Sequence, residues 1–516
     1  MRAEMLARIR ESRVWDVVVI GGGATGLGTA LDAASRGYQT LLLEAEDFAK
    51  GTSSRSTKLI HGGVRYLARG EIGLVREALR ERSLLLQNAP HLVHDRAFLV
   101  PAYSYWDLAK YGAGLKAYDL LGAGHGFGPS RWLSRTDAMA TVSTLKSAGL
   151  RGGILYHDGQ FDDSRLAVSL MLTLLDQGGT ALNYAPVVDL IKSGGRVTGV
   201  TARDSETGEA LSITARSVVN ACGVYVDALR RIDDARAPQL LRPSRGVHIV
   251  LDRAFLPNDA ALMVPRTDDG RVLFLIPWHD RVLVGTTDVA VNEATIEPHA
   301  SKEEVTSLLE DSARYLTRAP RAEDIRSVFS GLRPLLEQKA RGSTARLSRE
   351  HAVLVSPSGL VTVTGGKWTT YRRMAADTVD RAVEVGGLTR APCITETLRL
   401  HGAIPSDPTS PLAWYGSEAT HVQELIASKP EWAEPVHPSL STRCGEVVWA
   451  VRHEMARHVE DVLARRSRAL FLDARASIDA APRVADLMAE ELGFDQTWRQ
   501  SEVDQFRELA RHYLPQ

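Results

Sequence analysis

The stretch that decides the fold is residues 16–44, DVVVIGGGATGLGTALDAASRGYQTLLLE. Its β-branched run at 16–20 predicts a short buried strand. A glycine-rich turn follows, residues 29–36 predict a helix that Gly37 ends, and residues 39–43 predict a second strand. Strand, turn, helix and strand within about 30 residues form the unit on which dinucleotide-binding folds are built.

Three glycines in the turn, Gly21, Gly23 and Gly26, follow the spacing GxGxxG. Gly21 permits the tight turn, Gly23 lets the backbone approach a pyrophosphate, and Gly26 lets the helix sit close to the strand. Glu44 closes the second strand, where its carboxylate can accept hydrogen bonds from ribose hydroxyls and repel a 2′-phosphate. We therefore expect a dinucleotide without that phosphate; the alternative is a glycine-rich turn in an unrelated α/β fold.

The composition is that of an ordinary globular protein, with 516 residues, of which 44% are hydrophobic and 24% charged. At about 100–200 residues per domain, this length predicts several domains. The net charge of −1 offers no global field to nucleic acid, so an anionic ligand must be bound by local arginines and lysines. Cys222, Cys393 and Cys444 are too sparse for a disulfide framework or a metal site, which favours a reducing compartment.

The remaining patterns predict a mixture of helices and strands. Helices are expected at 71–88, 164–177, 302–316 and 368–385, and strands within 187–220, at 248–251, 272–276 and 281–284, and at 353–355 paired with 360–364. No apolar run is long enough to span a membrane, and the charged N-terminus lacks the apolar core of a secretory signal. From about residue 412 the chain is mostly helical, and its charged run at 452–468 predicts either a solvated helix or a basic face for a membrane surface.

A second motif lies at residues 52–67, TSSRSTKLIHGGVRYL. It can line a phosphate-rich cofactor and present Arg65 to an anion, or it can be a serine-rich surface loop before a helix. The motif resembles the TSSxSSKLxHGGxRYL fingerprint of the FAD-dependent (aerobic) glycerol-3-phosphate dehydrogenases. Further motifs of that family follow in order, DGQFDDSRL at 158–166, ARSVVNACG at 215–223, IPW at 276–278, GTTD at 285–288, SGLRPL at 330–335 and GGKWTTYR at 365–372.

The resemblance implies FAD as cofactor and the oxidation of sn-glycerol 3-phosphate to dihydroxyacetone phosphate, with hydride passing to flavin N5 and electrons on to a quinone. Beside Gly21, Gly23, Gly26 and Glu44, it implies flavin contacts from Thr52, Ser53, Ser54, Lys58, His61, Gly62, Gly63, Val188, Ala221, Gly223, Gly366, Lys367, Thr369 and Thr370. The glycine pair 365–366 opens a helix whose N-terminus would stabilise the charge of reduced flavin; a merely permissive turn is the alternative.

A phosphate dianion needs several cationic donors. The resemblance implies Arg65, Tyr66, Arg333, Arg349 and Lys367 as substrate-binding residues, although Arg333 and Arg349 also fit a solvated surface. It also places His248 in the substrate site, and we predict His248 and Arg333 as catalytic residues. Histidine titrates near neutral pH and suits a proton acceptor, whereas the alternatives for His248 are a core histidine or one that only orients substrate.

The predicted fold class is α+β, an α/β Rossmann-like FAD-binding fold with an inserted β-rich substrate domain and a C-terminal helical domain. We expect residues 1–390 to form the oxidoreductase domain, with the substrate region at about 75–215 and 240–330, and 391–516 to form the helical domain. The rival functions are a glycerol-3-phosphate oxidase that makes hydrogen peroxide, an amino-acid-oxidase-like flavoprotein, and a flavin-fold binding protein without turnover. The implied location is the cytoplasm or the inner face of its membrane, with a homodimer as a further expectation and no metal or nucleic acid.

Overall fold

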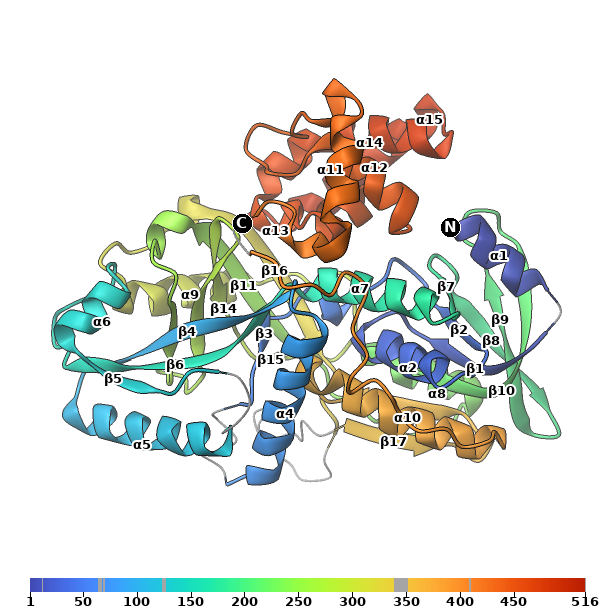
Figure 1. The fold of residues 1–516 in the computed structure, drawn as a ribbon, viewed down its shortest axis with the longest axis horizontal. Coiled ribbons are helices and arrows are strands. Elements are labelled where there is room, and N and C mark those ends of the chain that lie inside the picture. Colours follow the sequence, from blue (N-terminus) through green and yellow to red (C-terminus); the bar gives the residue numbers. More distant parts are fainter. Residues whose placement is uncertain are drawn as a thin grey trace.

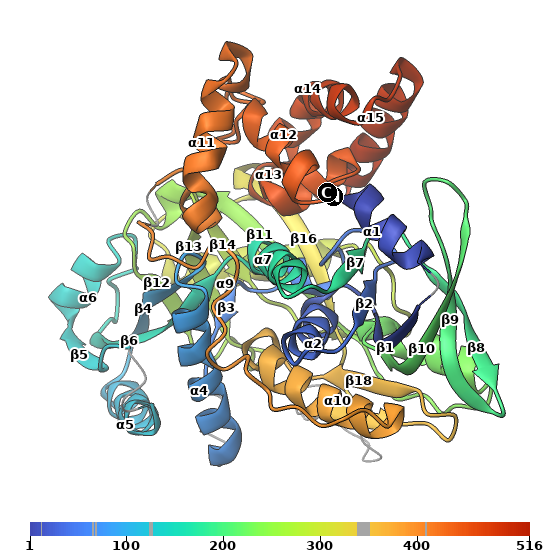
Figure 2. The same cartoon turned by 45° about the vertical axis from the view of Figure 1, so that its right-hand side comes forward.

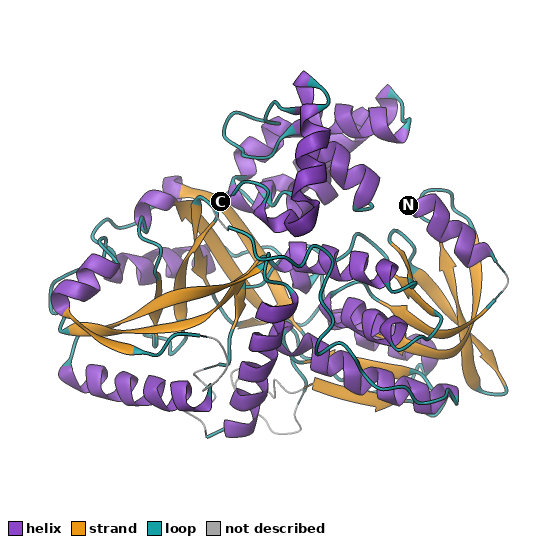
Figure 3. Cartoon of the chain, viewed as in Figure 1, coloured by secondary structure: helices purple, strands orange, loops and turns teal. Residues whose placement is uncertain are grey.

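The structure is a computed structural model that describes residues 1–11, 13–63, 67, 70–122, 127–337, 351–407 and 410–515. Two large sheets lie side by side, and a layer of C-terminal helices sits across them (Figure 1). Figure 3 shows the first sheet on the right and the second on the left. The predicted α+β fold class is confirmed.

The first sheet is built around β1 (Val14–Ile20), which pairs in parallel with β10 (Ala210–Asn220) on one side and β2 (Thr40–Leu43) on the other. Its parallel order continues to β18 (Val361–Gly365) beyond β10 and to β7 (Thr180–Leu182) beyond β2. Antiparallel partners are added by β17 (His351–Val355), β8 (Val187–Ser193) and β9 (Arg196–Arg203). The hairpin predicted at 353–364 is thus confirmed.

Three helices cover the first sheet, with α2 (Ala24–Ser35) between α7 (Asp163–Asp176) and α10 (Tyr371–Gly386). Helix α2 begins at Ala24, five residues before the predicted start, because the glycines that weaken a helix prediction here lie inside the helix. A Cβ on Gly26 would lie 1.8 Å from the carbonyl oxygen of Gly21, and one on Gly28 would lie 2.6 Å from the ring of Tyr371. Packing therefore requires both glycines.

The second sheet has the order β15-β11-β14-β13-β12-β4-β6-β3, with β16 paired to β11 and β5 to β6. Its strands are β3 (Leu59–Ile60), β4 (Val93–Ala102), β5 (Arg131–Ser134), β6 (Gly152–Phe161), β11 (Ser244–Asp252), β12 (Ala261–Val264), β13 (Leu273–Trp278), β14 (Arg281–Gly285), β15 (Val289–Ala290) and β16 (Ile325–Arg333). The helices of this half are α4 (Ile72–Asn88), α5 (Tyr105–Leu121), α6 (Arg135–Thr141) and α9 (Lys302–Tyr315), whereas α8 (Val226–Asp233) packs against β8, β10 and β18 of the first sheet. The chain crosses between the sheets repeatedly, so that of the substrate region expected at 75–215, β4–β6 lie in the second sheet while β7–β10 complete the first.

The C-terminal helices are α11 (Ala419–Ala427), α12 (Cys444–His453), α13 (Ala469–Leu472), α14 (Ala474–Leu492) and α15 (Gln496–Arg511). With their connections, residues 410–515, they are called the helical domain below. Figure 2 shows this domain above α7, with α1 (Arg2–Arg10) beside it. Its apolar core is continuous with that of the second sheet, where Phe329 and Phe471 meet edge to face. Within the described ranges, no helix is both long and apolar enough to cross a membrane.

Candidate active site

The glycine-rich turn presents bare backbone at the N-terminus of α2. Gly21 has a φ of +111°, its amide donates to Leu43 O at 2.8 Å, and a Cβ there would lie 2.6 Å from Ala221 O. Gly23 caps the helix without a side chain. The first amides of a helix have no partner within it and carry partial positive charge, so this turn can bind a phosphate.

Glu44 and Ser53 fix the two sides of this turn. The Glu44 carboxylate accepts hydrogen bonds from the backbone amides of Gly22 and, at 2.9 Å, Glu46. Burial raises the pKa of this carboxyl above its ordinary value, against the effect of the two amides. Ser53 Oγ accepts from the amide of Ala24 at 2.9 Å, which joins the second motif to the first turn of α2.

Ser53 thus lies against this turn, whereas Lys58 of the same motif turns inward. Its amine donates to Ser54 O at 2.8 Å and to Asp163 Oδ2 at 2.7 Å, and the residue has no exposed surface. Burial lowers the pKa of Lys58 to about 7. The Lys58 side chain thus contacts protein here, and its predicted contact with the cofactor stays a prediction. Ser54 is also buried, while the Thr52 hydroxyl donates to Leu332 O at 2.6 Å.

The later predicted cofactor residues return to the same place. Trp368 Nε1 donates to Ser53 O at 2.8 Å, which brings the segment 365–370 to the second motif. Gly366 has a φ of +65°, Lys367 precedes the short helix Trp368–Thr370, and Thr369 is buried. Ala221 and Gly223 follow β10, where the Ala221 amide donates to Ile20 O at 2.9 Å beside the glycine turn.

The other residues predicted to contact the cofactor are more widely spread in the structure. Val188 lies at a bulge in β8 and is half exposed, although the preceding Ala185 amide donates to Glu44 O at 2.8 Å. Gly62 donates to the Tyr118 hydroxyl at 2.8 Å, and Gly63 has a φ of +78° next to His61 and Gly62. The predicted substrate residues Arg65, Tyr66 and Arg349 lie outside the described residues.

His248 is a buried residue of β11. Its ring stacks on Phe329 with centroids 4.9 Å apart, and its Nε2 is 2.9 Å from Thr57 Oγ1. Its Cδ2 would be 2.1 Å from a Cβ on Gly285, so the glycine makes room for the ring. Burial, followed by the charges of Lys58 and Arg333, holds the pKa of His248 well below its ordinary value, so the imidazole is neutral at pH 7.

Arg333 ends β16 on the same face of the second sheet. Its Nη2 donates to Thr286 Oγ1 and Thr287 O, both at 3.1 Å, and would lie 2.2 Å from a Cβ on Gly246. Gly246 and His248 are two residues apart in β11 and therefore face the same way. The structure thus brings a guanidinium and a neutral imidazole together beside the second motif. Thr57 and Thr286 complete this group; the sequence motifs contain both threonines but gave no role to either.

The comparisons with known proteins agree with this geometry. Residues 16–372 match the family model of the FAD dependent oxidoreductases, and 365–499 match the C-terminal domain of alpha-glycerophosphate oxidase. The mitochondrial glycerol-3-phosphate dehydrogenase of Mesocricetus auratus is 38% identical over 539 residues, which cover 98% of this chain and 74% of that protein. The chain belongs to the FAD-dependent glycerol-3-phosphate dehydrogenase family.

Other members of the family support the assignment. The mitochondrial enzyme of Homo sapiens is 37% identical over 99% of this chain and 75% of its own. The glycerol-3-phosphate dehydrogenase of Bacillus halodurans, solved with FAD, superposes with a TM-score of 0.82 at 30% identity, covering 99% of this chain and 97% of that one. The L-alpha-glycerophosphate oxidase of Mycoplasma pneumoniae shares the fold, with a TM-score of 0.57 at 15% identity over 74% of this chain and 98% of that one.

FAD is the cofactor of this family, and the residues of this chain fit it. A Cβ on Gly21 would lie 2.6 Å from Ala221 O and one on Gly23 3.1 Å from Ser53 Oγ, so both glycines keep the backbone of the turn bare for a pyrophosphate. The Glu44 carboxylate lies beside this turn for a ribose. The second motif then runs from this turn to the sheet face that carries His248 and Arg333. Ser53 at one end of this stretch meets the turn, and Thr57 meets His248, so one motif links the two expected ends of the cofactor.

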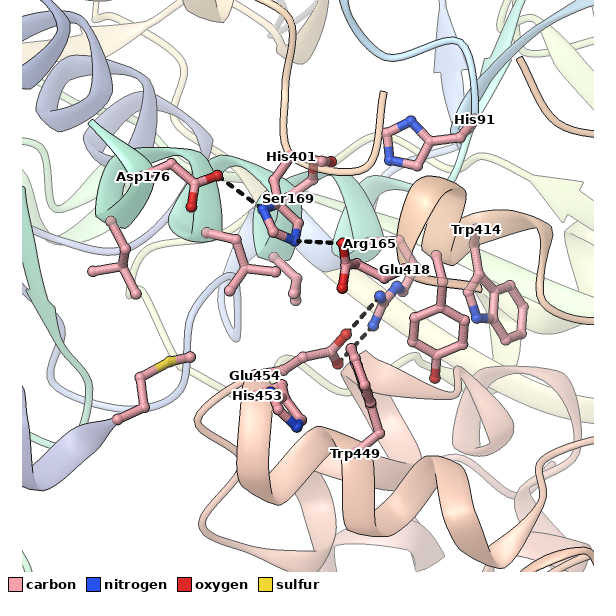
Figure 4. Close-up of a pocket in the computed structure, with 15 residues that line it drawn as sticks. His91, Arg165, Ser169, Asp176, His401, Trp414, Glu418, Trp449, His453 and Glu454 are labelled. Atoms are coloured by element: carbon pink, nitrogen blue, oxygen red, sulfur yellow. Dashed lines mark hydrogen bonds and ion pairs between the residues drawn. The ribbon is translucent and has the colours of Figure 1, made fainter. Parts of the chain in front are cut away.

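A separate cavity of about 170 Å³ lies between α7 and the helical domain (Figure 4). Arg165 and Glu454 form a bidentate ion pair in its wall at 2.7 and 2.8 Å, and imidazoles of His91, His401 and His453 surround it. Burial lowers the pKa of His91 to about 3. No residue of the predicted flavin or substrate site lines this cavity.

Proposed function

We propose that this chain oxidises sn-glycerol 3-phosphate to dihydroxyacetone phosphate and passes the electrons to a quinone. The observation that carries the proposal is the pairing of Arg333 and His248 on one face of the second sheet, beside the motif that meets the dinucleotide turn. A guanidinium fits the phosphate of this substrate, and an imidazole fits its hydroxyl. The names of the relatives that align with nearly the whole chain support the same substrate.

The oxidation removes a hydride from C2 and a proton from the C2 hydroxyl. When bound, FAD supplies the hydride acceptor at its N5. The chain supplies the proton acceptor: His248 is neutral because it is buried, and the Thr57 hydroxyl holds its Nε2 at 2.9 Å. Because a depressed pKa also weakens a base, a role for His248 in orienting the hydroxyl is the alternative within the same proposal.

Arg333 anchors the phosphate in this proposal, with Arg65, Tyr66, Arg349 and Lys367 as further predicted donors. The Thr286 hydroxyl and Thr287 carbonyl hold its guanidinium, and Asp288 Oδ1 lies 3.4 Å from its Nη1. This network fixes the orientation of the guanidinium, which lowers the entropy cost of binding an anion. A quinone is the proposed electron acceptor, and the match of 365–499 to the C-terminal domain of alpha-glycerophosphate oxidase favours oxygen as the second candidate.

We propose further that the enzyme works at the inner face of the cytoplasmic membrane, with α5 against the lipid. This helix exposes Tyr105, Trp106 and Leu120 by 72%, 74% and 78%. Lys110 and Lys116 lie on the same exposed side, and α5 is on the opposite side of the molecule from the helical domain (Figure 1). Aromatic rings and lysines on one surface helix are typical of binding at a lipid interface.

The decisive experiment mixes the purified FAD-loaded protein with sn-glycerol 3-phosphate without oxygen and follows the absorbance of oxidised flavin. Bleaching with this substrate, but not with sn-glycerol 1-phosphate, is expected. Flavin that then stays reduced in oxygen until a quinone is added supports the dehydrogenase, whereas rapid return with peroxide supports the oxidase. Bound flavin that is not bleached would refute the proposed substrate.

A further inference from the structure

The helical domain sends three arginines from one short stretch into the flavin-binding part of the chain. Arg465, Arg466 and Arg468 are 1%, 2% and 0% exposed. Consecutive side chains of an α-helix diverge by about 100°. Here residues 461–466 form a wider π-turn, and Arg468 has a left-handed backbone with a φ of +64°, so that these neighbouring side chains all reach the same part of the chain.

Two of the arginines bind Asp47. Arg465 Nε and Arg466 Nη1 both donate to its Oδ2 at 2.5 Å, and Arg466 Nη2 donates to its Oδ1 at 2.9 Å. Asp47 itself has no exposed surface. It lies three residues after Glu44, so this cluster fixes the start of the segment 47–58 that leads from the ribose position to the second motif.

The third arginine fixes the other end of the segment 47–58. Arg468 Nη2 donates to Ser54 O at 2.9 Å and to Asp163 Oδ1 at 3.1 Å. The second oxygen of Asp163 binds the Lys58 amine at 2.7 Å and the Ser56 amide at 3.0 Å. Asp163 therefore joins the arginine of the helical domain to the end of the segment.

We propose that Arg465, Arg466 and Arg468 are positioning residues that hold the segment 47–58 in the conformation that FAD requires. The segment contains one short helical turn, Thr52–Ser54, and so depends on its side-chain partners for its shape. Because its charges are buried, the segment cannot shift without leaving a charge unpaired. The inference rests on the proposed flavin site, and it gives the helical domain a part in building that site.

The test compares Arg466→Lys with Arg457→Lys. Arg457 also joins the helical domain to the flavin-binding part, through Glu206 at 2.7 and 2.9 Å, but it does not touch the segment 47–58. Lysine keeps the charge and loses the fork that binds both oxygens of Asp47. The apo-proteins are titrated with FAD, and binding is followed by flavin fluorescence and by the visible absorption of the bound flavin. Far-UV circular dichroism confirms that each apo-protein is folded at the temperature used.

We expect R466K to weaken FAD binding at least tenfold and to move the spectrum of the bound flavin toward that of free flavin, while R457K matches the wild type. Equal FAD affinity and spectra in R466K and the wild type would overturn the inference and leave the flavin assignment intact. Wild-type protein that binds no FAD would refute the flavin assignment first. If R466K does not fold, Asp47→Asn carries the same test from the segment itself, with the same expected and refuting results.

Discussion

Two ion pairs between the helical domain and the rest of the chain have the same geometry and different burial. Arg165 binds Glu454 through two hydrogen bonds of 2.8 and 2.7 Å, and Arg457 binds Glu206 through two of 2.7 and 2.9 Å. The side chains of the first pair are 5% and 1% exposed, and those of the second 17% and 24%. Replacing each arginine by methionine therefore separates the effect of burial from that of geometry.

Arg165→Met should cost about 3–5 kcal/mol of unfolding free energy, because the buried Glu454 carboxylate loses both hydrogen bonds to Arg165 and keeps the weaker attraction of Arg466 Nε at 3.9 Å. Arg457→Met should cost about 0–1 kcal/mol, because water can solvate Glu206 once the arginine is gone. Urea unfolding followed by far-UV circular dichroism measures both losses. The double variant R165M/E454Q should recover part of the first loss, because it removes the unpaired charge.

The pH dependence gives a second, independent signature. Burial alone would raise the pKa of Glu454, but Arg165 holds it below its ordinary value. In the wild type, this carboxylate contributes stability that is present above the unfolded pKa of about 4.3 and lost as the pH falls through the lower folded pKa. In R165M burial is opposed by Arg466 and His453 without the larger effect of Arg165, so the folded pKa of Glu454 rises and the variant should gain stability relative to the wild type as the pH falls. Equal losses in R165M and R457M, with no such relative gain, would refute the reasoning.

Three further results are expected. Gly26→Ala places a Cβ 1.8 Å from a backbone oxygen and should purify without FAD, while Gly73→Ala, with nothing within 4 Å, should keep a normal ratio of flavin to protein absorbance. Burial would lower the pKa of His458, but Glu502 and nearby acids raise it to about 9. The contribution of His458 to stability is therefore complete below about pH 6.5 and is lost as the pH rises through 9. His458→Gln should flatten the dependence of the melting temperature on pH over that interval, and an unchanged slope would count against the pairing of His458 with Glu502. Arg333→Lys should raise KM for sn-glycerol 3-phosphate at least tenfold with a smaller change in kcat; an unchanged KM would remove Arg333 from phosphate binding.

Sequence patterns predicted those helices, strands and turns that are determined by neighbouring residues. The strand, glycine turn and second strand at 16–43 were predictable because each is set by neighbouring residues, as were α4 at Ile72–Asn88 and α9 at Lys302–Tyr315. The resemblance in sequence supplied His248 and Arg333, whose proximity depends on the pairing of β11 with β16. The residues of β11 and of β16 do not indicate which strand each pairs with.

The charged run at 452–468 shows that a local sequence pattern does not identify the distant partners of its charged residues. We expected a solvated helix or a basic face for a membrane, and this is wrong for Arg465, Arg466 and Arg468, which are buried. Their partners, Asp47 and Asp163, come from the other end of the chain, and nothing in the spacing of the arginines indicates where those carboxylates lie. The sequence likewise does not indicate that Lys58 is buried against Asp163, whose carboxylate binds its amine at 2.7 Å.

Strand order along the chain determines when, during synthesis, the first sheet can close. β1 pairs with β10, and β10 pairs with β18 at Val361–Gly365, so the sheet lacks an inner strand until most of the chain has left the ribosome. Asp47 is made long before its partner. Arg466 follows it by 419 residues, and the synthesis of these residues takes about 20–80 s at the usual speed of translation. Until β18 has been made, the nascent chain carries an open strand edge at β10, the kind of edge that chaperones shield. On the proposal that Arg465, Arg466 and Arg468 hold the segment 47–58 for FAD, the cofactor binds after Arg466 has been made, and a chain shortened before Arg466 should leave the ribosome without it.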